Sequence, residues 1–146
     1  MIEKLSINLS KHRIEKEKDL FSQAKILHEN KKYDGCINRS YYAIFNAIRS
    51  LIAFLKVDSS KHSGVLSLFD RYFIKTGVMD KSLSKIAHLA FDSRQEFDYE
   101  DFYSPNQKEA KRQLDNCKRF IDEATDVFSK IIHGKIDLLE IEEKNI

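Results

Sequence analysis

The sequence predicts an all-α protein, an antiparallel bundle of four to five helices in one domain. Apolar residues recur at intervals of three and four along most of the chain, which is the helical period, and no stretch alternates as a half-buried strand does. Hydrophobic residues make up 42% and charged residues 33%, with 1 proline and 4 glycines, so little interrupts the helices. A chain of 146 residues supports one hydrophobic core of ordinary size.

Five stretches carry the helical pattern, joined by short connections. We expect helices over residues 10–30, 36–55, 59–77, 80–103 and 104–134, the first two forming a hairpin around the break "ENKKYDG". We assign residues 1–133 to one helical domain and residues 134–146 to a short C-terminal tail that is amphipathic or frayed.

Short polar residues and glycines mark the ends of these helices. Ser59 or Ser60 is the expected N-cap of the third helix, and Gly77 is expected to end it. Asp80 is the expected N-cap of the fourth helix. In "SPNQ", residues 104–107, the serine is the expected cap of the fifth helix and the glutamine completes a capping box.

Charge, hydropathy and cysteine spacing exclude several classes of function. A net charge of +2 gives no overall field that attracts nucleic acid, so such binding needs a local patch or a dimer groove. No apolar run approaches the roughly 20 residues that cross a membrane, and the N-terminus lacks the apolar centre of a signal peptide, which predicts a cytoplasmic protein. Cys36 and Cys117 have no metal-ligand spacing and are expected as buried free thiols.

The helix over residues 36–55 carries a second, polar ridge beside its apolar stripe. Arg39, Tyr42, Asn46 and Arg49 recur at steps of three, four and three, which places them on one side of the helix. One interpretation is a functional surface. The alternative is a solvated edge whose arginines pair with neighbouring carboxylates.

The segment "SSKHSG", residues 59–64, is a second candidate site. Free backbone N–H groups at a helix N-terminus, together with Lys61 and His62, would form a pocket for an anion. The alternative is an ordinary capped turn.

Three segments, taken in order, resemble the HEPN superfamily and specifically its small single-domain prokaryotic branch. They are "NRSYYAIFNAIRSLI", "KHSGVLSLFDRYFIKTGVMDK" and "AFDSRQEFDYEDFYSPNQKEA", which together span about residues 36–110. Tetratricopeptide repeats also contain tyrosine- and alanine-rich helix hairpins, but this chain has no repeated unit.

The resemblance implies an all-α bundle that forms a two-fold homodimer. Many HEPN proteins are ribonucleases; others bind RNA or nucleotides, or act in toxin–antitoxin pairs with a small nucleotidyltransferase. In the active ribonucleases, an arginine is followed four to six residues later by a histidine, and the two copies meet to form one composite site.

The chain departs from this motif at both matching positions. In "RQEFDY", Arg94 begins the motif but Asp98 stands where a histidine is expected, and Arg39 is followed seven positions later by Asn46. An imidazole exchanges protons near neutral pH, whereas an exposed aspartate is ionised and an asparagine does not titrate. The resemblance therefore implies a degenerate ribonuclease motif. His62 is the candidate to replace the missing histidine, and only the fold could bring it near Arg94.

Arg94, Asp98 and Tyr99 are the candidate catalytic residues, with His62 as the fourth. Arg94 would hold a phosphate, Asp98 would orient the guanidinium, and Tyr99 would stack on a base or donate its hydroxyl. The alternative is an exposed ion pair between Arg94 and Asp98, one helical turn apart. The acidic residues around them are either solvated surface or ligands of a divalent cation, and no other cofactor is expected.

The resemblance implies that RNA or a nucleotide binds to the polar ridge together with two further cations, that is, to Arg39, Tyr42, Asn46, Arg49, Lys61 and Arg94. The leading interpretation is therefore an HEPN-like protein that binds RNA or a nucleotide within a toxin–antitoxin or defence module. One alternative is an active, metal-independent ribonuclease. The other is a non-catalytic interaction module for a nucleotidyltransferase. For Arg39 itself, the alternative is a structural pair with Asp98 or Asp101 inside the bundle.

Overall fold

The computed structural model describes residues 4–99 and 104–144, the side chains of residues 94–99 excepted. Within these residues the chain is helical and contains no strand, which confirms the predicted all-α class. The elements in chain order are α1 (Lys4–Glu29), α2 (Tyr33–Ile52), the 3-10 segment η1 (Ala53–Leu55), α3 (His62–Phe69), the π-helical segment η2 (Asp70–Ile74), α4 (Lys81–Tyr99), α5 (Gln107–Ile132) and α6 (Leu138–Glu143).

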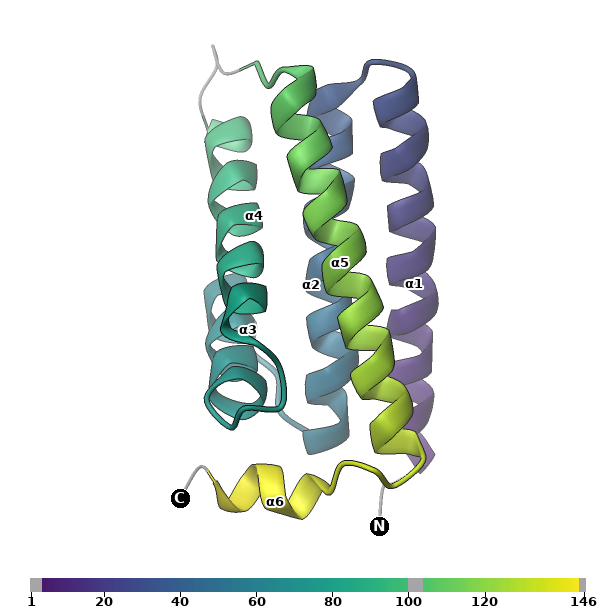
Figure 1. Cartoon of the computed structure of the whole chain (residues 1–146), viewed down its shortest axis with the longest axis vertical. Helices are drawn as coiled ribbons and strands as arrows, with labels where there is room; N and C mark the ends of the chain where they lie inside the picture. The colour runs from purple at the N-terminus through teal and green to yellow at the C-terminus, as the bar shows by residue number, and fades with distance from the viewer. Residues whose placement is uncertain (1–3, 100–103, 145–146) are drawn as a thin grey trace.

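The long helices lie side by side, and α6 crosses one end of the bundle (Figure 1). Helix α2 is central, because it packs against α1, α4 and α5, and also against α3. The tight turn between α1 and α2 makes the predicted hairpin. Each of the other helices therefore has one face on α2 or on its neighbours and another in solvent.

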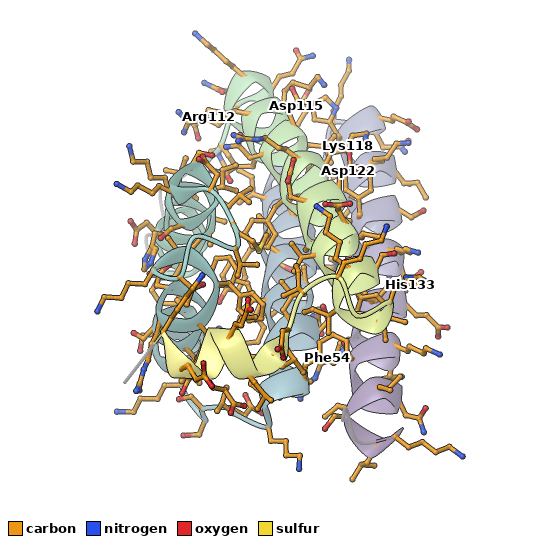
Figure 2. All side chains as sticks on the ribbon, turned by 60° about the horizontal axis from the view of Figure 1, so that its bottom comes forward. Phe54, Arg112, Asp115, Lys118, Asp122 and His133 are labelled. Carbon is orange, nitrogen blue, oxygen red and sulfur yellow. The ribbon has the colours of Figure 1, made fainter. Side chains whose placement is uncertain are left out.

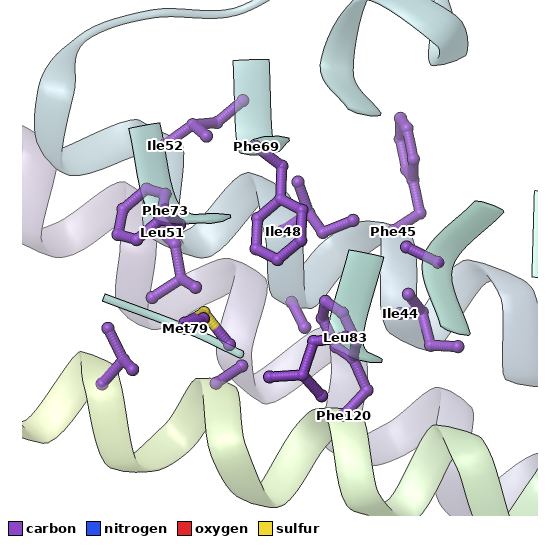
Figure 3. Packing of buried hydrophobic residues seen from close by; sticks show 14 of the residues in the cluster. Ile44, Phe45, Ile48, Leu51, Ile52, Phe69, Phe73, Met79, Leu83 and Phe120 are labelled. Atoms are coloured by element: carbon purple, nitrogen blue, oxygen red, sulfur yellow. The ribbon is translucent and has the colours of Figure 1, made fainter. Parts of the chain in front are cut away.

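The core is built from the apolar stripes that the sequence predicts. Ile48 and Leu51 of α2 meet Phe69 of α3, Leu83 of α4 and Phe120 of α5, and all five side chains are at most 1% exposed (Figure 3). Truncating a buried phenylalanine to alanine typically costs about 3–5 kcal/mol, so these rings carry much of the stability of the fold.

The outer face of α5 neutralises its own charge. Lys118 forms an ion pair of 2.7 Å with Asp122 one turn later, and Lys111 pairs in the same way with Asp115 at 2.6 Å. Asp115, Lys118 and Asp122 follow one another along the helix (Figure 2). Such exposed pairs contribute a few tenths of a kcal/mol each, and they leave α5 with little net field on this face.

Four predicted helix starts are wrong. α2 begins at Tyr33 rather than at residue 36, so part of the expected break is helical. α1 begins at Lys4 rather than near residue 10. The N-cap of α3 is Lys61, not Ser59 or Ser60, because the Ser59 hydroxyl accepts the Lys61 N–H within the preceding loop. The N-cap of α5 is Asn106 rather than the serine of "SPNQ", since its side chain accepts the Glu109 N–H at 2.9 Å.

The helix ends predicted at Asp80, Gly77 and Gly134 are confirmed. The Asp80 carboxylate accepts the Ser82 N–H at 3.0 Å at the start of α4. Gly77 and Gly134 follow η2 and α5 with φ of 82° and 72°, a left-handed conformation that glycine adopts without strain.

The C-terminal segment docks onto the bundle. Asp137 caps α6 by accepting the Leu139 N–H at 3.0 Å, and Ile141 is buried in the same hydrophobic cluster as the long helices. The residues assigned from sequence to a short tail thus contribute one side chain to the core.

The loop between η1 and α3 is pressed against α3 at Gly64. A Cβ atom at this position would lie 2.1 Å from the Ser59 Oγ and 2.7 Å from the Ser59 Cβ. Both distances are far below van der Waals contact, so only glycine fits here. The glycine of "SSKHSG" is therefore explained by the close approach of the loop.

Glu17 is an unusual member of the interior. This side chain of α1 is fully buried, neither carboxylate oxygen has a hydrogen-bond partner within normal distance, and it lies near Cys117 of α5. Burial raises the pKa of Glu17 to about 8, against smaller opposing effects of Lys18 and Thr125. Burial, followed by the Glu17 charge, also raises the pKa of the Cys117 thiol, so the thiol is inert at neutral pH.

Glu17→Gln should remove a pH dependence of stability. In the wild-type protein the folded state keeps a proton that the unfolded state loses above pH 4.5. The contribution of Glu17 to the free energy of unfolding should therefore be constant below about pH 4.5, fall by roughly 1.4 kcal/mol per pH unit, and level off near pH 8. Urea unfolding at several pH values across this range measures the free energy of unfolding. The variant should show a flatter profile and exceed the wild type at pH 8; parallel profiles would contradict the assignment.

Gly64→Ala should destabilise the protein by about 1–3 kcal/mol, because the new methyl group overlaps the Ser59 side chain. Thermal unfolding of the variant, and of the double variant Gly64→Ala/Ser59→Gly, measures the effect. The double variant should recover part of the loss, since it lacks the opposing atoms. An equal loss in both variants would place the cause elsewhere than this contact.

Candidate functional site

An open hollow of about 550 Å³ lies where the start of α3 meets α2. It is lined by Arg49 of the polar ridge and by three residues of "SSKHSG". The sequence predicts these two features as separate candidate sites. The lining residues are Phe45, Arg49, Asp58, Ser59, Ser60 and His62.

His62 is held in place by two aromatic side chains of α2. Its Nδ1 atom lies 2.7 Å from the hydroxyl oxygen of Tyr41, and its ring centroid lies 4.2 Å from that of Phe45. Tyr41 is buried, and its hydroxyl reaches a polar partner. The imidazole therefore has a defined orientation beside the hollow.

The same aromatic cluster extends to α4. The ring of Tyr41 lies 6.1 Å from that of Phe91, and Tyr42 lies 6.2 Å from His62. Arg94 follows Phe91 by three residues, which is about 4.5 Å along the helix axis. Tyr41 therefore contacts both His62 and the turn of α4 that precedes Arg94.

The predicted roles of Arg94, Asp98 and Tyr99 concern side chains that lie outside the described residues, as does Asp101. The backbone of residues 94–99 continues α4.

Two arginines share one carboxylate at the opposite edge of the hollow. Arg49 pairs with Asp58 at 2.8 Å, and Arg13 of α1 lies 3.7 Å from the same carboxylate. Arg13 also donates to the Arg49 carbonyl at 2.9 Å, which ties α1 to this edge. The three side chains together leave one positive charge.

The ionisation of this group is fixed at neutral pH. Partial burial acts to raise the pKa of Asp58, but the Ser59 N–H and the Arg49 guanidinium outweigh it and hold that pKa below its usual range. Burial and the charge of Arg49 lower the pKa of Arg13, which Asp58 partly opposes.

The rest of the predicted ridge points elsewhere. Arg39 donates to the Gln23 side chain of α1 at 3.1 Å and to its neighbour Asn38 at 2.7 Å. Asn46 is buried and donates to the Tyr42 carbonyl at 2.8 Å. Lys61 is exposed, next to His62 in the chain. The structure therefore brings Tyr42, Arg49 and His62 together and leaves Arg39 apart from them. Their roles in binding RNA or a nucleotide stay predictions.

A second hollow of about 590 Å³ lies between the N-terminal end of α5 and the C-terminal half of α4. Gln113 is buried beside it and donates to the Ser93 hydroxyl at 3.0 Å. Sequence reasoning did not identify Gln113, although a polar residue within the apolar stripe of α5 was a signal. It missed Arg13 as well, for which no local spacing signal exists.

Among the described residues, no group of three or more histidine, cysteine, aspartate or glutamate side chains is placed to hold a metal ion. Most of the acidic segment considered for a divalent cation lies outside those residues. No helix within the described ranges is both long and apolar enough to span a bilayer.

Comparison with known proteins agrees with the fold. The family model described as HEPN domain matches residues 10–127. The "UPF0332 protein" of Thermotoga maritima is 32% identical over 105 residues, covering 72% of this chain and 80% of that protein. "Putative toxin MJ0605" of Methanocaldococcus jannaschii is 30% identical over 119 residues, covering 82% and 88%. "Putative toxin MJ0142" of the same organism is 29% identical over 126 residues, covering 85% and 86%. The chain therefore belongs to the HEPN domain family.

Proposed function

We propose that this HEPN protein binds single-stranded RNA in the hollow between α2 and α3, next to the Arg94 segment of α4. The observation that carries the proposal is the aromatic cluster in which Tyr41 and Phe45 hold His62, and in which Tyr41 also contacts Phe91, one turn before Arg94. A histidine distant in sequence is thus tied, through Tyr41, to the helix that carries Arg94.

The hollow has the chemistry that single-stranded RNA needs. His62 in the lining and Tyr42 beside it are half-buried rings on which unstacked bases can pack, and stacking is worth about 1–3 kcal/mol per base. The Arg13, Arg49 and Asp58 group supplies one net positive charge at the edge for a phosphate.

The biological role that fits is the toxin-like component of a toxin–antitoxin or defence module. Two of the relatives carry the name "Putative toxin". A homodimer with a composite site, and a nucleotidyltransferase-type partner, are parts of this proposal that follow from the family resemblance.

RNA cleavage is a second candidate, favoured by the same histidine. An imidazole can accept a proton from a 2′-hydroxyl and return one to the leaving oxygen, which neither Asp98 nor Asn46 can do near neutral pH. Such a reaction needs no metal ion. Arg94 would stabilise the phosphate charge.

His62→Gln should weaken binding of a labelled single-stranded RNA by roughly 5- to 20-fold, because the variant loses one stacking ring and the partner of Tyr41. Tyr42→Ala and Arg94→Ala should weaken it similarly. The matched control is His12→Gln, which removes an exposed imidazole of α1. Filter retention at several salt concentrations measures affinity, gel analysis of the same samples measures cleavage, and light scattering measures the mass.

The outcomes separate the candidates. Retention without cleavage in the wild type supports RNA binding alone, and cleavage lost in His62→Gln but kept in His12→Gln supports the ribonuclease. Equal affinity of all variants would move the RNA site elsewhere. A wild-type protein that neither retains nor cuts RNA at low salt would leave the interaction module as the better interpretation.

A further inference from the structure

A third hollow, of about 790 Å³, opens between η2 and the first two turns of α4. Its lining is strongly basic. Arg71 and Lys75 come from η2 and the residue after it, and Lys81 and Lys85 come from α4. None of the four had been identified from the sequence, because the two pairs belong to different elements and only the fold brings them together.

The one carboxylate in this lining is already occupied. Asp70 accepts the Ser84 hydroxyl at 2.6 Å on one oxygen, and its other oxygen lies 2.8 Å from the Nε2 atom of His88. Four cations and one carboxylate give the lining a net charge of +3, before any charge on His88 is counted. The hollow is therefore a local positive field in a protein whose net charge is only +2.

The arrangement places like charges side by side. Lys81 and Lys85 are four residues apart on α4, so they lie on the same face, and like charges at this spacing destabilise a helix. Arg71 and Lys75 have the same spacing along the π-helical turn that the Lys75 N–H closes on the Asp70 carbonyl. Among the described residues, no ion pair offsets any of the four cations. π-Helical turns such as η2 often occur at functional sites.

We propose that this basic hollow binds backbone phosphates of RNA. Phosphate contacts require only cations and hydroxyl donors, whereas binding a base or a nucleoside requires a ring for stacking, and no aromatic side chain lines this hollow. The inference rests on the proposed function. Lys85 precedes Phe91 by six residues on α4, about 9 Å along the axis, so one strand could contact both the hollow and the candidate site.

The test uses the full chain, labelled with ¹⁵N, and a single-stranded RNA of about 12 nucleotides. Addition of the RNA should shift the backbone amide signals of Lys75, Lys81 and Lys85. The variant Lys81→Glu/Lys85→Glu should bind this RNA about tenfold more weakly at about 50 mM salt. For this variant, the slope of log affinity against log salt concentration should be less steep by about 1.4, because each phosphate contact on a single strand contributes about 0.7 to that slope.

The matched control is Lys11→Glu/Lys16→Glu, which changes the net charge by the same amount at exposed positions of α1. Its affinity and salt dependence should stay close to those of the wild type. Equal losses in both double variants would reduce the effect to overall charge and overturn the proposal.

The amide signals distinguish this proposal from the proposed function. Shifts at the hollow without shifts at Tyr42 and His62 would support the hollow and overturn the candidate site, and the reverse pattern would overturn the hollow alone. Shifts at the hollow with inorganic tripolyphosphate but not with the RNA would make it a site for a free polyphosphate, and shifts only with polyglutamate would make it a protein-docking surface. Either of the last two results overturns the proposal.

Discussion

The burial of α2 on several sides is the constraint on which the rest of the structure depends. α1, α4 and α5 all pack against it, and small residues such as Ala43 and Ala47 are fully buried where the neighbours approach. Polar groups inside this packing bond locally: the Ser50 hydroxyl donates to the Ala47 carbonyl, and Ser10 of α1 donates to the Ser50 carbonyl. A helix held in this way cannot rotate, so the direction of Tyr41 and Phe45 is fixed, and with it the place of His62.

The local features of the fold could be predicted from sequence, and the site could be predicted only in part. Helical periodicity identified the long helices because burial of one face repeats every three to four residues. The caps at Ser59 and in "SPNQ" were misplaced because several adjacent polar residues compete for the same N–H groups, and the tertiary setting decides between them. The contacts of Tyr41 with His62 and Phe91, and the role of Arg13, depend on distant segments, for which a single sequence carries no signal.

Net charge is a poor guide to the surface of this protein because the charges are unevenly balanced. On α5, acidic and basic side chains alternate and pair within the helix, so that face has little field of its own (Figure 2). Around η2 and the start of α4, four cations face one carboxylate that is already bonded. A total of +2 therefore contains both a neutral face and a basic one, and only the basic one can attract an anion at moderate salt.

The loop between η1 and α3 connects stability to the candidate site. Its close approach to Gly64 fixes Ser59, whose N–H donates to Asp58 at 2.9 Å, and Asp58 in turn holds Arg49 and Arg13. The same loop ends at Lys61, where α3 begins with His62 against Tyr41. The imidazole and the guanidinium groups on the two edges of the hollow are thus positioned by one short segment. A change that loosens this loop would move both edges together, so the cation group and the histidine are expected to respond as a unit rather than as independent residues.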